Sequence, residues 1–306
     1  MDFLYLLEKI RNPVLDFIML NITKFGEELI FMLIAVYVLW CVDKQKGYFL
    51  LFVGFSGIQI NQLLKVSFRV PRPWVIDPNF KAVDAALPEA TGYSFPSGHT
   101  QTAVGTYGSL FAAFKNRGIR ILSAAVCILT PISRMYLGVH TPLDVGVSFG
   151  VAILLVFVFG FVFKKIGGSK KGMRILFLTL ILISLVTTIY MTITLKSETE
   201  KNVLNALENF YKMLGAITGM YIIYELDTAF IKFETKAVWW AQVLKVLLGL
   251  GIIMGVKLLG YEVFGAFLPT HIAKGITYFL LVLVAGAVWP LTFKFFSKLG
   301  KKSGAN

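Results

Sequence analysis

The feature that most constrains the fold of this chain is a succession of nine long apolar stretches. The chain has 306 residues, of which 57% are hydrophobic, a share too high for a soluble domain to bury. A helix that crosses a bilayer needs roughly 20 mostly apolar residues. The sequence therefore predicts an all-α fold, a multi-pass transmembrane helical bundle. The stretches are centred near Ile34, Gly54, Thr106, Cys127, Leu154, Leu182, Met220, Gly249 and Val284.

Residues 1–26 differ from these stretches, because apolar and charged residues alternate along them. This pattern predicts an N-terminal helical segment of one or two short helices lying in the membrane interface. The alternative is a short tenth span from Val14 to Leu20. The chain start has no basic region ahead of an apolar stretch, so we expect no cleaved signal peptide.

The formal net charge of +13 raises the question of a nucleic-acid partner. The positive residues instead gather in three connections between or after apolar stretches, which is typical of loops on the cytoplasmic side of a membrane. With nine spans, all three clusters fall on that side, the N-terminus lies outside, and we expect no nucleic acid as partner. The clusters are Lys115, Arg117 and Arg120; Lys164, Lys165, Lys170, Lys171 and Arg174; and Lys294, Lys298, Lys301 and Lys302.

A polar break that begins at Lys196 divides the chain into two parts. We expect residues 27–196 to form a six-span core and residues 197–306 to add three transmembrane helices packed on it. The longest connection, about 69–95, contains several turn residues. Three of its aromatic residues are expected at headgroup level. They are Trp74, Phe80 and Tyr93.

The phrase Pro96-Ser97-Gly98-His99 stands immediately before an apolar stretch. Ser97 is a favoured N-cap residue, and Gly98 lets the backbone approach a ligand closely. The free N–H groups at such a helix start form a ready site for an anion. The alternative is a simple helix cap at the membrane boundary.

A second phrase has a similar design and places His140 ahead of Pro142 and Asp144. Proline suits the first turn of a helix, and residues four apart can share one face. A carboxylate bonded to one imidazole nitrogen leaves the other free as a nucleophile or base. The chain has three histidines, and two of them stand at outer helix starts.

Three cations lie at the same predicted side as both histidines: Lys65, Arg72 and Arg134. Cations near helix ends usually reach for the headgroups, but a guanidinium fork also suits phosphate oxygens. Asn61 and Gln62 precede Lys65 in one apolar stretch, so we expect them to face the protein interior near the site.

Together these phrases resemble the signature of the type 2 phosphatidic acid phosphatase superfamily. The pattern is Lys-x6-Arg-Pro, Pro-Ser-Gly-His and Ser-Arg-x5-His-x3-Asp, and every fixed position is matched over about residues 27–195. Nine spans with the N-terminus outside also resemble the glucose-6-phosphatase and sphingosine-phosphate phosphatase branches. The resemblance implies that residues 27–196 are the phosphatase core.

The resemblance also implies residue roles. His140 would attack phosphorus and form a phosphohistidine, Asp144 would orient it, and His99 would protonate the leaving oxygen and later activate water. Five residues would hold the phosphate oxygens: Lys65, Arg72, Ser97, Gly98 and Arg134. No cofactor or metal is expected, because the sequence contains no cluster with metal-ligand spacing.

The function expected from these features is an integral-membrane, metal-independent phosphatase acting on a lipid phosphate or diphosphate. Its site would face the periplasm, exterior or lumen, and its partners would be that substrate and membrane lipids, with the oligomeric state open. Candidate substrates are phosphatidic acid, phosphatidylglycerol phosphate, a polyprenyl diphosphate and a sphingoid-base phosphate. The alternatives are a phosphotransferase between lipids and a transporter or scaffold on the same fold.

Among the remaining residues, Lys245 lies mid-way along an apolar stretch, where a charge is a functional candidate. The competing interpretation is that it faces a wet crevice or pairs with an acid such as Glu225 or Asp227. Cys41 and Cys127 are expected to be reduced packing residues.

Overall fold

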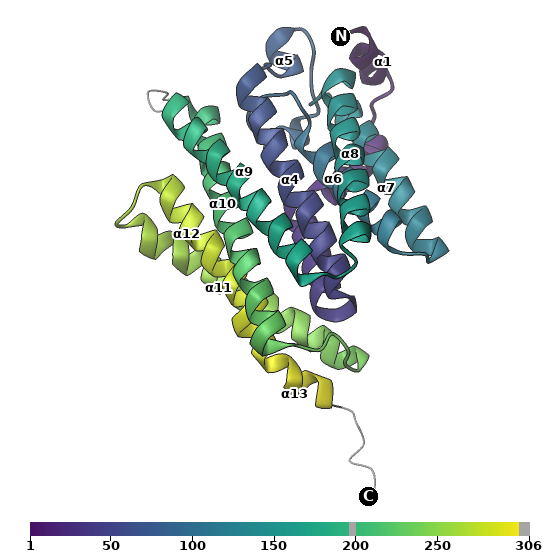
Figure 1. Cartoon of the computed structure of the whole chain (residues 1–306). Helices are drawn as coiled ribbons and strands as arrows, with labels where there is room; N and C mark the ends of the chain where they lie inside the picture. The colour runs from purple at the N-terminus through teal and green to yellow at the C-terminus, as the bar shows by residue number, and fades with distance from the viewer. Residues whose placement is uncertain (196–199, 300–306) are drawn as a thin grey trace, which may run out of the picture. The chain divides into compact units, whose positions relative to one another are not determined.

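The computed structural model of the chain describes residues 1–195 and 200–299. Lys301 and Lys302 of the predicted basic tail, and most of the polar break, lie outside them. Every regular element in the described ranges is helical (Figure 1). They are α1 (Asp2–Lys9), α2 (Pro13–Thr23), η1 (Lys24–Gly26), α3 (Glu28–Tyr37), η2 (Val38–Val42), α4 (Lys44–Phe68), α5 (Pro73–Ile76), η3 (Asp84–Ala86), α6 (Gly98–Ala113), α7 (Arg117–Tyr136), α8 (Pro142–Ile166), α9 (Lys170–Thr194), α10 (Lys201–Leu226), η4 (Asp227–Ile231), α11 (Trp239–Gly265), α12 (Thr270–Leu283), η5 (Val284–Val288), η6 (Trp289–Thr292) and α13 (Phe293–Lys298).

A helix lies at each of the nine predicted centres, so the all-α multi-pass fold is confirmed. Within the described residues, seven helices are long and apolar enough to cross a membrane, or eight if a bent pair counts as one span. That pair joins 13–26 to 28–42 with a bend of 51°. The remaining centre, Thr106, falls in α6, which has only 16 residues and is shorter than a bilayer requires.

The helices begin where short polar side chains can bind free backbone N–H groups. The Asn12 side chain accepts from Leu15 at the start of α2, and the Asn116 side chain accepts from Ile119 at the start of α7. At its other end, α8 stops at Gly167, whose φ of 56° is a left-handed conformation that glycine adopts readily.

The chain divides into two compact units. The first comprises Met1–Ala35, Tyr48–Gly167 and Glu200–Asn205, and the second Val36–Gly47, Gly168–Thr199 and Ala206–Asn306. The predicted division at residues 27 and 197 stays a prediction.

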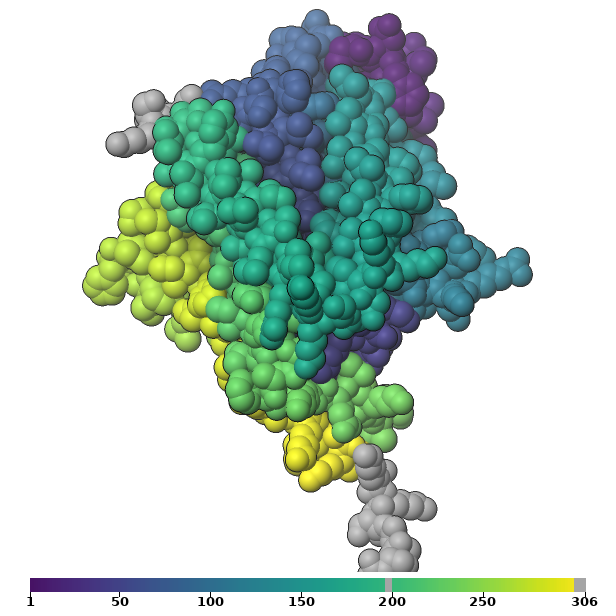
Figure 2. All heavy atoms as spheres, in the orientation of Figure 1, coloured from purple at the N-terminus to yellow at the C-terminus, as the bar shows by residue number. Residues whose placement is uncertain are grey.

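In the first unit, α6 packs against both α7 and α8. Ala103 and Val104 on α6 are completely buried and pack in one cluster with Cys127 of α7 and Ala152 of α8. The opposite surface of α8, teal in Figure 2, carries apolar side chains such as Phe157, which is 77% exposed. Exposing that apolar surface to water would be unfavourable, whereas contact with lipid chains would not. Both observations suit a helical bundle in a bilayer.

In the second unit, Lys245 does not pair with an acid, so the predicted partners Glu225 and Asp227 are wrong. Its ammonium group donates to the carbonyl oxygens of Trp40 at 2.9 Å and Thr235 at 3.3 Å. Lys245 is 1% exposed. Carbonyl oxygens and an aromatic ring, rather than a carboxylate, therefore satisfy this buried cation; the ring is that of Phe293 at 4.5 Å.

The two acids have other cations as partners. Asp227 lies 2.6 Å from the ammonium nitrogen of Lys44, and Glu225 receives two hydrogen bonds from the guanidinium of Arg174, each 2.7 Å. These ion pairs hold parts of the second unit together. Lys245 has a structural role in the same unit through its own contacts with carbonyl oxygens.

Candidate active site

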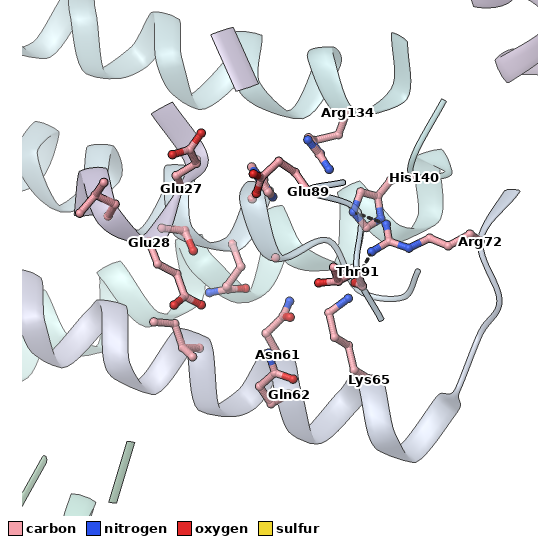
Figure 3. Close-up of a pocket in the computed structure, with 17 residues that line it drawn as sticks. Glu27, Glu28, Asn61, Gln62, Lys65, Arg72, Glu89, Thr91, Arg134 and His140 are labelled. Carbon is pink, nitrogen blue, oxygen red and sulfur yellow. Dashed lines mark hydrogen bonds between the residues drawn. The ribbon is translucent and has the colours of Figure 1, made fainter. Parts of the chain in front are cut away.

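The first unit contains a cavity of about 370 Å³ where the ends of several helices meet (Figure 3). Six of the eight residues predicted for the site line it: Lys65, Arg72, Gly98, His99, Arg134 and His140. Ser97 and Asp144 do not line it. The cavity also receives Asn61 and Gln62 from α4, as the sequence predicts.

The three predicted cations are buried at this cavity and bind neutral acceptors. Lys65 donates to the carbonyl oxygen of Tyr93 at 2.5 Å. Arg72 donates to the carbonyl oxygens of Gly92, Thr91 and Val139. None of these cations has a carboxylate within ion-pair distance among the residues that the structure describes. Asp144 and Glu89 act on these cations only from beyond that distance. Burying a positive charge without a carboxylate in contact is costly, so the cavity favours an anion.

Arg134 gives the strongest indication that the cavity favours an anion. It is 1% exposed, and only its Nη1 has a partner, the hydroxyl of Thr23 at 2.8 Å. Its Nε and Nη2 atoms are buried without a hydrogen-bond partner. Buried donors are nearly always satisfied in proteins, and a guanidinium fork matches two phosphate oxygens. A bound phosphate group would supply the missing acceptors.

His140 lies in the turn that precedes α8 rather than on the helix itself. Its Nδ1 is 3.5 Å from Oδ2 of Asp144, and its Nε2 is 3.0 Å from Nη1 of Arg72. Because arginine can only donate, Nε2 must be the unprotonated nitrogen, which leaves the proton on Nδ1 facing the carboxylate. This is the tautomer that a nucleophilic Nε2 requires.

Burial is the main reason that the pKa of His140 lies well below its usual value, followed by the positive charge of Arg72 and then of Arg134 and Lys65. Both effects disfavour an additional proton. His140 is therefore a neutral imidazole at neutral pH, with a lone pair on Nε2.

Asp144 is held in place by its own helix start. One of its oxygens accepts from the backbone N–H of Thr141 at 2.8 Å and from the hydroxyl of Ser94 at 2.6 Å. Thr141 in turn caps the backbone N–H of Asp144, which completes a capping box at the start of α8. The carboxylate beside His140 is thus fixed by helix capping and by a serine from the 69–95 connection.

His99 is the second residue of α6, and its Nε2 is buried without a hydrogen-bond partner. Gly26 in η1 packs directly on it: a Cβ added there would lie 2.6 Å from the His99 carbonyl oxygen. Only glycine fits this approach. No local pattern in the sequence predicts that residues 24–26 reach the site.

Ser97 is the N-cap of α6, as predicted. Its hydroxyl accepts from the backbone N–H of Thr100 at 3.4 Å, and its own N–H donates to the carbonyl oxygen of Asp144 at 3.1 Å. The backbone bond joins the two helix starts that carry His99 and His140. In this structure the Ser97 side chain is engaged in capping, and its predicted contact with phosphate stays a prediction.

The 69–95 connection departs from the prediction in one respect. Phe80 and Tyr93 are buried rather than at headgroup level. Tyr93 supplies the carbonyl that binds Lys65, while its hydroxyl donates to Glu200 at 2.6 Å. Sequence reasoning missed that Tyr93 and Ser94 contact the predicted site residues Lys65 and Asp144. Their only sequence signal is their place three and two residues before Pro96.

Comparisons with known proteins agree with this site. The PAP2 superfamily profile matches residues 45–166, which contain all the signature phrases. An undecaprenyl-diphosphatase of Bacillus subtilis is 34% identical over 153 residues, covering 49% of this chain and 75% of that protein. The chain belongs to the PAP2 superfamily. The resemblance noted in the sequence is therefore confirmed, and the chain is a multi-pass membrane protein of this phosphatase superfamily.

Two further relatives and a second profile extend the PAP2 assignment. A probable sphingosine-1-phosphate phosphatase of Dictyostelium discoideum is 32% identical over 160 residues, 48% of this chain and 38% of that protein. Phosphatidylglycerophosphatase B of Bacillus subtilis is 27% identical over 164 residues, 49% of this chain and 75% of that protein. The profile of the transmembrane extension of PAP2 superfamily phosphatases matches residues 211–302. No solved structure matches the chain.

Proposed function

We propose that this PAP2 protein is a metal-independent membrane phosphatase that hydrolyses the phosphomonoester or diphosphate of a lipid through a phosphohistidine at His140. The observation that carries the proposal is the cavity in which the unprotonated Nε2 of His140 faces buried cations that have no carboxylate within ion-pair distance among the described residues. A phosphate group would satisfy those cations and bring phosphorus to the nucleophile.

In the first half of the reaction, the lone pair on Nε2 of His140 attacks phosphorus. A P–N bond forms as the P–O bond to the leaving group breaks, and His99 gives a proton to the leaving oxygen. Burial lowers the pKa of His99, as do the cations Arg134, Arg72 and Lys65. The negative charge of the bound phosphate offsets those cations, so His99 can carry that proton. Arg72 Nη1, which binds Nε2 in the resting site, turns its donors to the phosphate oxygens. Lys65 and Arg134 stabilise the charge that develops on those oxygens.

In the second half, neutral His99 takes a proton from water, and the hydroxide attacks phosphorus. The P–N bond breaks, inorganic phosphate leaves, and His140 returns to the neutral Nδ1–H tautomer. Asp144 stabilises positive charge on the imidazole while the P–N bond exists. Ser97 and Gly98 hold phosphate oxygens in this scheme through the start of α6.

The lipid nature of the substrate rests on two supports. The names of all three relatives describe enzymes that act on the phosphate of a lipid. The cavity also lies at helix ends in a membrane protein, where a lipid headgroup is close at hand. We further propose a site facing the extra-cytoplasmic side of the cell membrane, because the basic loops suit the cytoplasmic side, and a six-helix core at 27–196 with three helices added at 197–306.

The test is release of inorganic phosphate by the purified protein in detergent, from phosphatidic acid, phosphatidylglycerol phosphate, a polyprenyl diphosphate and a sphingoid-base phosphate. We expect at least one to be hydrolysed without an acceptor lipid, and the His140→Ala variant to be inactive but folded. Turnover only when an acceptor lipid is added would indicate a phosphotransferase instead. A native protein that turns over none of them would contradict the proposal.

A further inference from the structure

The cavity of the candidate active site is divided by charge. Figure 3 shows Glu27 and Glu28 on the opposite side of the cavity from Arg72 and His140. A third carboxylate, Glu89, also lines the cavity. A site that bound only a phosphate group would gain nothing from these carboxylates, since they repel an anion. They require an explanation from the other part of the substrate.

Helix capping explains only part of this acidic half. Glu27 and Glu28 stand at the start of α3, where acidic residues favour the helix dipole. Glu89 has no such reason to be there, because it lies in the connection between η3 (Asp84–Ala86) and α6. Two separate segments of the chain therefore deliver carboxylates to the same cavity.

An independent observation on Asn61 indicates what these carboxylates bind. Asn61 is 3% exposed, lines the cavity, and stands one helical turn before Lys65 on α4. Its Nδ2 donates to the carbonyl oxygen of Pro96 at 3.4 Å, which leaves Oδ1 as a buried acceptor without a partner. A buried acceptor of this kind needs a donor, and a phosphate oxygen cannot donate once it is ionised.

The three carboxylates and Asn61 are not suited to bind a divalent cation. In the described part of the chain, no three His, Cys, Asp or Glu side chains lie close enough together to hold a metal ion. The carboxylates come from separate places in the cavity lining, as hydrogen-bond acceptors for a polar group would. An ammonium group offers three donors and a positive charge, and so matches both the carboxylates and Asn61.

We propose that the acidic half of the cavity, Glu27, Glu28 and Glu89 with Asn61, binds an ammonium group on the alcohol part of the substrate. The preferred substrate is then the phosphomonoester of a lipid amino alcohol. A diphosphate is disfavoured because it would bring a second anion towards the carboxylates. The inference rests on the proposed function and narrows its substrate class.

The test compares two long-chain alkyl phosphates of equal length, one with an amine on the carbon next to the ester carbon and one without it. Phosphate release by the full-length protein in detergent micelles gives kcat/KM for each. We expect a preference for the amine of about tenfold, which is the order that one or two partly exposed charge pairs supply. In the double variant Glu27→Gln, Glu89→Gln the preference should fall to about twofold or less.

The matched control is Glu262→Gln, an exposed glutamate of α11 outside the cavity, which should keep the native preference. If the double variant does not fold, as judged by its melting temperature, the single variants Glu27→Gln and Glu89→Gln serve, and each should lower the preference. Equal use of both substrates by the native protein, or an unchanged preference in the variants, would overturn the inference. Hydrolysis of neither substrate nor any other lipid phosphate would overturn the proposed function itself.

Discussion

Nη1 of Arg72 lies 3.0 Å from Nε2 of His140. The contact fixes the histidine tautomer, because the guanidinium can only donate and Nε2 must accept. The same Arg72 donates to three backbone carbonyls of the neighbouring loops. One residue therefore orders the loops, presents the lone pair of the nucleophile, and brings a positive charge to the place where phosphate would bind.

Replacing Arg72 by lysine keeps the charge and removes the planar fork. We expect kcat/KM for phosphate release to fall about a hundredfold, because several donors are lost together. The melting temperature should also fall, because carbonyl oxygens of the buried loops lose partners. Arg120→Lys, at the exposed start of α7, is the matched control and should change neither. Near-native kcat/KM in Arg72→Lys would show that the fork has no part in the reaction.

Asp144 and Ser94 act on the nucleophile in series. Asp144→Asn should lower kcat by about a hundredfold or more, since an amide cannot stabilise the imidazole cation as a carboxylate does. Ser94→Ala removes one hydrogen bond to that carboxylate and should cost about three- to tenfold. Because Ser94 acts by positioning, its variant should also shift the acid limb of the pH–rate profile. An unchanged limb together with unchanged kcat would exclude this role.

The lowered pKa of His140 makes a prediction about stability and pH. The unfolded chain binds a proton on this histidine below about pH 6.5, whereas the folded protein, in which burial lowers that pKa, does not. The free energy of unfolding should therefore fall as the pH falls below about 6.5, by up to roughly 1.4 kcal/mol per pH unit from this group.

Thermal unfolding in detergent between about pH 5 and pH 7 measures that slope across the range where a histidine of ordinary pKa titrates. The His140→Gln variant should lose part of it. His271→Gln is the matched control, because its imidazole is only partly buried and should contribute less. An identical slope in native protein and His140→Gln would contradict a neutral buried imidazole.

Phosphate release should survive a strong metal chelator. Protein cations supply the charge stabilisation in the proposed mechanism, and a histidine rather than a metal-bound hydroxide supplies the nucleophile. The measurement is the initial rate before and after incubation with chelator, followed by dialysis. Loss of activity that added Mg²⁺ or Zn²⁺ restores would show that the reaction needs a metal.

The helices were predictable from the sequence because the bilayer imposes a length and a composition on each span. Helix starts were also predictable, because few residue types are favoured there. Ser97 caps a free N–H group at the start of α6, and Pro142 occupies the first turn of α8, where no N–H group is needed. The short α6 was predicted as a ninth span, because its apolar composition reflects burial between α7 and α8 as much as contact with lipid. Composition alone does not separate these two surroundings.

The signature phrases predicted which charged groups meet at the cavity, but not what holds them. Ser94, Tyr93 and Gly26 reach the site through tertiary contacts that leave no local pattern in the sequence. Lys245 shows the same limit: its partners are carbonyl oxygens, and any residue can supply a carbonyl. Glu27 and Glu28 stand at a helix start, but no local pattern in the sequence places them in one cavity with Glu89.

The most direct test of the account is a rapid-quench experiment with a lipid substrate that carries a radiolabelled phosphate. During turnover the protein should carry a phosphoryl group on His140 that is stable in alkali and released by acid, as expected for a P–N bond. The label should be absent from the His140→Ala variant. Native turnover without any such label, together with phosphate release by His140→Ala at a comparable rate, would contradict the phosphohistidine mechanism.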